Sequence, residues 1–148
     1  MTAPVTTVVE SKLRTGVLKL GAPDATPAVP LTEFGCQATS VIISPDYKED
    51  GEAQETLCGG TLPAATTVSR TLKITAIQDF DNPAGFMRFL RAHELETLDF
   101  EWQANPAAEI ASGTLQARLG DWGGDVGKRV TTAPEMPIIT ISWAEPTP

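Results

Sequence analysis

The chain has 148 residues, which is the length of one domain and enough for one ordinary hydrophobic core. Hydrophobic residues make up 41% and charged residues 20%, a balance typical of a soluble globular protein with polar loops. The net charge of -8 disfavours attraction to nucleic-acid phosphates, which bind mainly to Lys and Arg. Two interpretations of the acidity stay open: solubility alone, or a surface that repels a polyanion.

The sequence shows no sign of a membrane segment or of a metal framework. No basic and apolar signal segment opens it, and no apolar run approaches the length of a membrane span. Cys36 and Cys58 are its only cysteines and do not form a CxxC pair. This spacing disfavours a zinc site or a disulfide framework and predicts reduced, buried thiols in a cytosolic setting.

The first third of the chain predicts short strands between loops. Residues 1–16 are rich in Thr, Val and small residues, typical of an edge strand or of an arm that orders against a neighbour. Residues 17–20 form a short strand candidate, and the three prolines of residues 21–30 predict a loop. The β-branched run at residues 36–44 predicts a strand.

An acidic segment follows at residues 45–55. It is longer than a tight hairpin turn, and such a loop inside a compact domain is often functional. The next residues, ETLCGG at 55–60, are expected to form a short return strand that ends at the double glycine.

Two segments alternate strictly between apolar and polar residues, which predicts strands with one buried face and one solvent face. They are residues 70–78 and 97–103. The apolar faces are Leu72, Ile74 and Ala76 in the first strand, and Leu98, Phe100 and Trp102 in the second. The polar faces are Thr71, Lys73 and Thr75 in the first, and Thr97, Asp99, Glu101 and Gln103 in the second.

The segment between these strands changes to helical spacing. Asn82 is the expected N-cap and Pro83 the expected first helical residue, where a missing N–H costs nothing. The stripe predicted to face a sheet consists of Phe86, Phe89, Leu90 and His93.

The last third predicts two further strands around a loop. Residues 114–120 alternate, residues 121–129 form a glycine-rich loop, and residues 137–143 form the last strand, with Ile139, Ile141 and Trp143 on one side. We expect a single domain over residues 1–148, with an N-terminal arm at about 1–16 and a short C-terminal tail at about 144–148.

No combination of residues predicts catalysis, a cofactor or a metal. His93 is the only histidine, and its place on the apolar stripe favours a structural role over that of a general base. Lys128 follows Gly127, but Arg129 stands where a phosphate-binding loop needs a hydroxyl. The acidic residues lack calcium-loop spacing, and the Asp99 and Glu101 pair lacks the aromatic platform expected of a glycosidase.

The order and local sequence of four segments resemble the major tail proteins of long-tailed phages with non-contractile tails. The segments are CQATSVIISPDY, ETLCGG, RTLKITAIQDFDNPAGFMRFLRAHELETLDFEWQANPA and SGTLQARLGDWGGDVGKR. The resemblance spans residues 34–130. It implies a tail-tube fold, mainly β: a β-sandwich or partial barrel with one packed α-helix. It further implies hexameric rings stacked into a tube through which double-stranded DNA leaves the virion without specific binding.

The resemblance also implies the partners and the location of the protein. The partners are other copies of the chain, together with tape-measure, tail terminator and baseplate or tip proteins, and no membrane. The location is the tail of the virion, after assembly in the host cytoplasm. Many members of the family carry an additional immunoglobulin-like domain, which is not expected within residues 1–148.

Combined with the charge pattern, the resemblance selects candidate surfaces. A basic channel wall holds DNA, whereas an acidic wall lets it slide. The candidate lumen residues are Thr71, Lys73, Thr75, Thr97, Asp99, Glu101 and Arg118. The candidates for ring stacking, besides the N-terminal arm, are Asp46, Tyr47, Lys48, Glu49 and Asp50 in one loop, and Asp121, Trp122, Asp125, Lys128 and Arg129 in the other.

Other functions remain open on the sequence alone. A polar sheet face is also the ordinary solvent side of a sheet. One alternative is another ring-forming virion protein, such as a tail terminator or head–tail joining protein. The other is a β-sandwich module that binds carbohydrate or a host surface. Filament formation separates the tube protein from the single-ring proteins, and glycan binding favours the module. An enzyme is disfavoured because no nucleophile and base form a set.

Overall fold

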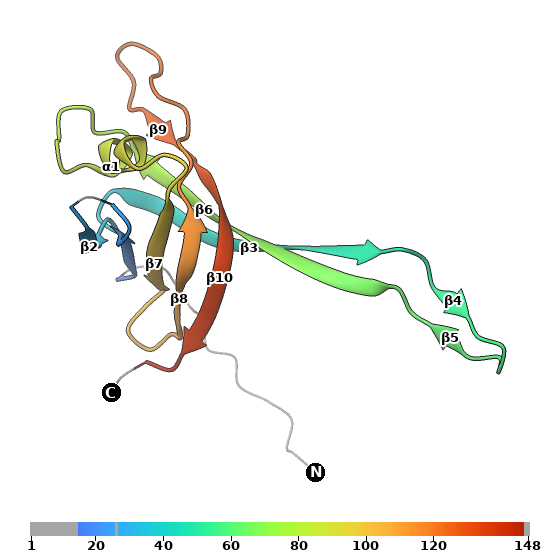
Figure 1. Cartoon of the computed structure of the whole chain (residues 1–148). Coiled ribbons are helices and arrows are strands. Elements are labelled where there is room, and N and C mark those ends of the chain that lie inside the picture. Colours follow the sequence, from blue (N-terminus) through green and yellow to red (C-terminus); the bar gives the residue numbers. More distant parts are fainter. Residues whose placement is uncertain (1–14, 26, 147–148) are drawn as a thin grey trace, which may run out of the picture.

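A computed structural model gives the fold and describes residues 15–25 and 27–146. Strands dominate the described part of the chain, which contains one short helix (Figure 1). In chain order, the elements of the described residues are β1 (Val17–Ala22), β2 (Val29–Glu33), β3 (Ala38–Asp50), β4 (Gln54–Glu55), β5 (Thr61–Leu62), β6 (Ala65–Ile77), α1 (Phe86–Ala92), β7 (Thr97–Gln103), β8 (Ile110–Gln116), β9 (Thr131–Thr132) and β10 (Glu135–Ala144).

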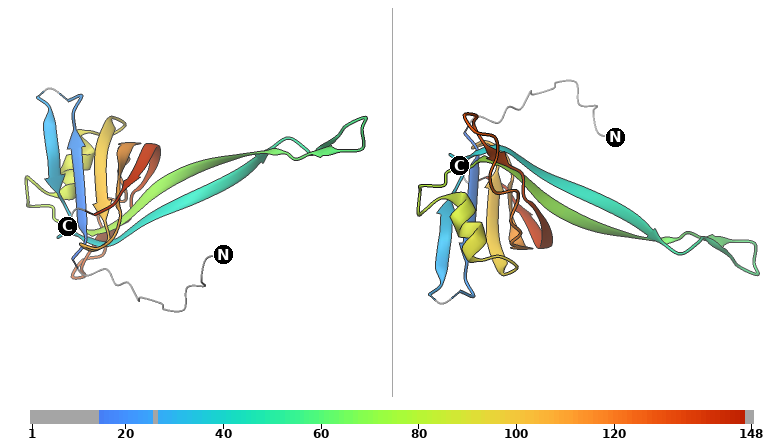
Figure 2. Two further views of the ribbon diagram at one scale, coloured as in Figure 1. Left: turned by 90° about the horizontal axis from the view of Figure 1, so that it is seen from below. Right: turned by 90° about the horizontal axis from the view of Figure 1, so that it is seen from above.

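One antiparallel sheet contains most of the strands, in the order β2-β1-β7-β8-β10-β6-β3, and β9 pairs with β6. The sheet bends at β10, whose first half pairs with β6 and whose second half pairs with β8. A register shift between Ile138 and Thr140 separates the two halves. Strands that change layer at a bulge form the corners of β-sandwiches. We call β2-β1-β7-β8-β10 the first layer and β10-β6-β3 the second layer (Figures 1 and 2).

Close backbone contact supports this corner. Gly113 of β8 lies against Thr140 of β10, and a Cβ at position 113 would collide with the carbonyl oxygen of Thr140. Only glycine permits such an approach. Beside it, the hydroxyl groups of Thr114 and Thr140 are 2.8 Å apart and hydrogen-bond across the two strands.

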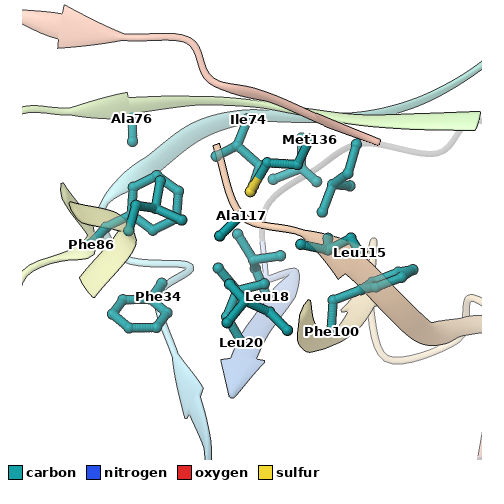
Figure 3. Packing of buried hydrophobic residues seen from close by; sticks show 14 of the residues in the cluster. Leu18, Leu20, Phe34, Ile74, Ala76, Phe86, Phe100, Leu115, Ala117 and Met136 are labelled. Carbon is teal, nitrogen blue, oxygen red and sulfur yellow. The ribbon is translucent and has the colours of Figure 1, made fainter. Parts of the chain in front are cut away.

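The hydrophobic core lies between the layers and under the helix (Figure 3). Leu18 and Leu20 come from β1, Ile74 from β6, and Leu115 from β8, and all are almost completely buried. The remaining buried members include Phe34, Val41, Leu72, Ala76, Phe86, Leu90, Leu98, Phe100, Ala111, Ala117 and Met136. The alternation predicted for residues 70–78 and 97–103 is therefore confirmed, because its apolar members supply this core, with Trp102 partly buried at its margin.

The helix starts later than predicted. Its N-cap is Gly85, and Asn82 instead accepts a hydrogen bond from the backbone N–H of Ala84 in a turn before the helix. The side-chain oxygen of Gln37 accepts from the N–H of Phe86 at 2.7 Å. A glutamine distant in sequence thus satisfies one of the free helix-end donors, which local capping signals do not reveal.

The largest difference concerns residues 45–55, which were expected to form a loop. β3 continues through them to Asp50 and pairs with β6 as far as the Asp50–Ala65 pair. The part of β6 that precedes Arg70 does not pair with β10. There β3 and β6 leave the body together as a hairpin (Figure 2). We call residues 46–69 the arm. Its tip is closed by the β4–β5 pair, and the expected return strand ETLCGG is a turn after Glu55, the last residue of β4.

Smaller differences affect strand ends and faces. β2 lies partly in the segment that its prolines predicted as loop, and β8 starts at Ile110 rather than at residue 114. The bulge also breaks the predicted side of the last strand, because Ile139 is exposed while Ile141 packs against the core. Trp143, predicted on that same side, is 54% exposed.

The predicted chain ends are only partly visible. Most of the N-terminal arm, residues 1–14, and the last two residues of the C-terminal tail, 147–148, lie outside the described residues. β10 ends at Ala144, where the tail was predicted to begin.

Candidate assembly surfaces

The outer face of the first layer carries the acidic part of the predicted lumen surface. Asp99 and Glu101 on β7 alternate with the buried Leu98 and Phe100, so their side chains lie on the face opposite the core. Thr97 belongs to the same face and is exposed. These three predicted residues are therefore brought together on one strand.

Neighbouring strands extend this face with small hydroxyl side chains. Asp99 lies opposite Thr114 and Glu101 opposite Ser112 on β8. Ser112 and Thr114 in turn lie opposite Ser142 and Thr140 on β10, with hydroxyl-to-hydroxyl distances of 3.3 Å and 2.8 Å. On the other side of β7, Lys19 is the register partner of Glu101. The face is hydrophilic, with Asp99 and Glu101 at its centre.

The other predicted lumen strand belongs to the second layer. Thr71, Lys73 and Thr75 alternate with the buried residues of β6 as predicted, but the bend at β10 separates them from β7. Lys73 forms an ion pair with Glu135 at 3.7 Å. The sequence therefore predicted the polar faces but joined into one wall two strands that lie in different layers. Nothing in the alternation of either strand signals the bend.

Arg118 follows the end of β8 and is exposed. Its Nε donates a hydrogen bond to the side-chain oxygen of Gln116 at 3.1 Å. It thus lies at the border of the first layer, beyond the paired part of β8.

The arm carries the first group of predicted stacking residues: Asp46, Tyr47, Lys48, Glu49 and Asp50 are all exposed members of β3. Tyr47 is 65% exposed and its register partner Val68 is 41% exposed. Between positions 46 and 55 the chain has five carboxylates and one lysine. The run ATTVS at residues 65–69, rich in β-branched residues and immediately before the strand predicted at 70–78, is the sequence signal that a longer hairpin leaves.

The second group lies in the predicted glycine-rich loop, which the structure confirms as a loop. Asp121, Trp122, Asp125, Lys128 and Arg129 are all exposed. Trp122 packs against Phe80 with ring centroids 5.6 Å apart, and the guanidinium of Arg91 lies 5.5 Å from the Trp122 ring. These contacts hold the start of the loop against the helix end of the body.

A glutamine that the sequence analysis did not select anchors this loop. Gln78 is only 8% exposed, and its Nε2 donates to the carbonyl oxygens of Gly123 and Thr131 at 3.1 Å and 2.8 Å. Its Oε1 accepts from the N–H of Gly123 at 2.9 Å. The buried amide thus fixes both ends of the loop, and its position after an apolar strand gave no indication of this role.

The remaining sequence candidates have structural roles or differ from expectation. His93 ends the helix, packs against Phe89 with the two rings tilted, and hydrogen-bonds Glu96 at 2.7 Å through Nδ1, as expected of a structural histidine. Cys36 and Cys58 are free but exposed, so the prediction of buried thiols is wrong. Both lie in turns, one before β3 and one at the arm tip.

The described part of the chain contains neither a metal-binding cluster of acidic, Cys or His side chains nor a membrane-spanning helix. Residues 15–25 and 27–146 contain no group of three or more His, Cys, Asp or Glu side chains placed to hold a metal ion. In the same residues, no helix has the length and apolar character needed to cross a bilayer.

Comparison with known proteins finds similarity at the level of structure. No protein-family model and no curated protein matches the chain. A chain from the tail of an empty GTA particle, determined by helical refinement with C6 symmetry, has a similar structure with a TM-score of 0.56. The two sequences are 14% identical, and the match covers 88% of this chain and 96% of that chain. The chain therefore shares the mainly β fold of a subunit of that tail, which confirms the predicted fold class.

Proposed function

We propose that this chain is the subunit of a phage tail tube: a structural virion protein that forms hexameric rings stacked into a conduit for double-stranded DNA. The observation that carries the proposal is the arm, a two-stranded hairpin that leaves the body and exposes apolar side chains. An isolated hairpin has marginal stability in water, so a partner surface is needed to hold it. The fold shared with a C6-symmetric tail supports other copies of the chain as that partner.

Free strand edges support lateral contact between copies. β2 and β3 are the outer strands of the sheet, and within the described residues no strand pairs with their outer edges. The β3 edge is 13 residues long, and unpaired edges of this kind are templates for pairing with another chain. In a closed ring, neighbouring copies would satisfy these edges.

The polar outer face of the first layer is the lumen surface in this proposal. Asp99 and Glu101 place negative charge there, whereas Lys73 of the second layer is paired with Glu135. A wall that repels phosphates lets DNA pass without binding. The second layer with Thr71, Lys73 and Thr75, and Arg118 at the border, then contribute to contacts between subunits.

The proposal includes the location and the further partners of the chain. The subunit functions in the virion tail after assembly in the host cytoplasm, where it meets tape-measure, terminator and baseplate or tip proteins. The arm and the 121–129 loop connect successive rings. No catalytic activity is assigned to it.

Sedimentation velocity of the purified full chain over a range of concentrations tests the proposal. We expect species many times heavier than the 15.7 kDa subunit, whose mass increases with protein concentration. A species that stops growing at six subunits would favour a single-ring virion protein, and a monomer at every concentration would exclude both.

A further inference from the structure

The tip of the arm presents a leucine to solvent. Leu57 is fully exposed, in a turn that Thr56 closes: the Thr56 N–H donates to the carbonyl oxygen of Gly60 at 2.7 Å. The N–H of Gly60 donates back to the Thr56 hydroxyl at 3.1 Å, and Gly59 has a φ of 80°, which glycine adopts freely. The turn is thus well defined, and no side chain of its own copy covers Leu57.

An apolar groove lies on the body of the same chain, between β2 and α1. It has a volume of about 300 Å³. Its lining includes Val29, Thr32, Phe34, Pro83, Phe89 and Ala92. Phe34 and Phe89 pack with their ring centroids 5.1 Å apart and form an aromatic wall. A closed cavity of about 150 Å³ accepts a benzene ring, so this groove has room for a leucine side chain.

Arg88 lines the groove and supplies a fixed positive charge. One of its terminal nitrogens donates to the carbonyl oxygen of Phe80 at 2.9 Å, which holds the guanidinium in place. Among the described residues, Arg88 forms no ion pair with a carboxylate. The charge is therefore oriented and available to an acidic group from outside.

The arm tip complements this groove in apolar character and in charge. Glu52 and Glu55 precede Leu57, and residues 51–62 contain no lysine or arginine. The groove offers an apolar wall with a cation, and the tip offers a leucine with two carboxylates. Within one copy the two cannot meet, because the arm projects away from α1 (Figure 2).

We propose that Leu57 at the arm tip of one copy docks into the groove between α1 and β2 of a second copy, with Glu52 or Glu55 beside Arg88. This inference rests on the proposed function and adds the surface that receives the arm. At about 3.3 Å per residue, residues 46–57 reach roughly 35 Å from the body, far enough to span to a neighbour. Because the two contact surfaces differ, each copy receives one arm and supplies another, and such contacts propagate as rings or filaments.

Photo-crosslinking from the tip tests the docking. In a Cys36→Ser variant, a maleimide photo-crosslinker attached to Cys58 lies next to Leu57. We expect crosslinks between copies that map to residues 29–34 or 83–93. Assembled protein whose crosslinks map elsewhere overturns the docking and leaves the proposed function standing. Protein that stays monomeric and forms no crosslink between copies overturns both.

Substitutions give an independent readout of the same contact. Leu57→Ser should weaken self-association about tenfold or more, since burial of one leucine has that effect. Leu95→Asn, at an exposed leucine with a φ of 67° that asparagine tolerates, is the matched control and should change little. Arg88→Glu should also weaken association, and adding Glu52→Arg and Glu55→Arg should restore it. A Leu57→Ser protein that assembles as tightly as the Leu95→Asn control would overturn the docking.

Discussion

Tyr47 and Val68 lie opposite each other on the two strands of the arm, on the same sheet face as the Val41–Ile74 and Ile43–Leu72 pairs. Val41, Ile74 and Leu72 are buried in the core, whereas Tyr47 and Val68 are largely exposed. The apolar face of the second layer therefore continues beyond the body of its own copy. An apolar face that one copy leaves uncovered is a surface for another.

Replacing this pair should weaken assembly without weakening the fold. In a Tyr47→Ser, Val68→Ser variant, we expect self-association to fall by about tenfold or more, because two apolar side chains no longer become buried between copies. The unfolding midpoint of the dilute monomer should stay nearly unchanged, since exposed substitutions change stability by about 0.5 kcal/mol or less. Sedimentation velocity and thermal unfolding measure the two effects.

The other face of the same arm provides the control. Lys48 and Thr67 are also register partners and both are exposed. If Lys48→Ser, Thr67→Ser lowers association as strongly as the apolar variant, the contact does not depend on the face that continues the core.

The helix offers a stability test that separates two phenylalanines. Phe86 is completely buried, so Phe86→Ala should lower the free energy of unfolding by about 3–5 kcal/mol. Phe89, which the helical spacing also assigns to the buried stripe, is only partly buried at the groove, so Phe89→Ala should cost clearly less. Urea denaturation of both variants measures the difference. Equal losses would mean that the helix packs with a different face toward the core.

Gln78 should control the order of the 121–129 loop. Gln78→Leu removes three hydrogen bonds and leaves backbone groups of Gly123 and Thr131 without their partner. We expect a loss of about 1–3 kcal/mol and faster hydrogen exchange at the Gly123 amide. Gln116→Leu, at a partly exposed glutamine on β8, is the comparison and should leave that amide unchanged. Unchanged exchange in the Gln78 variant would show that the loop is held by Trp122 alone.

The charge of the first layer should decide how assembled protein treats DNA. Asp99→Lys with Glu101→Lys should create binding to duplex DNA that weakens steeply with salt, because each added lysine neutralises a phosphate. The control, Asp79→Lys with Asp81→Lys, makes the same change of charge outside that face. Co-sedimentation of assembled protein with DNA at low and high salt gives the readout. Equal binding by the two variants would contradict the assignment of the lumen to β7.

Local chemistry made part of the fold predictable. The alternation in β6 and β7 identified the buried and polar faces correctly, because one face of each strand packs against the core. The glycine-rich loop and a helix between the two strands were also correctly predicted. Fold class follows from such patterns because strand and helix periods differ.

Features set by distant parts of the chain were not predictable. The bend at β10 is accompanied by the close approach of Gly113 to Thr140, and the N–H of the first helical residue is capped by the distant Gln37. Residues 45–55, most of which lie on the first strand of the arm, were interpreted as a loop because this acidic segment is longer than a tight hairpin turn. Charged residues are compatible with a strand that has no core of its own to cover. Because the sheet bends at β10, the polar faces of β6 and β7 lie in separate layers.

Electron microscopy of the concentrated full chain, with rotational averaging of end views, shows whether copies of the chain assemble into six-membered rings that stack into a tube. We expect hollow rings with six-fold symmetry and tubes made of stacked rings. A uniform field of compact particles of about 16 kDa, seen at every concentration and salt condition tried, would contradict it.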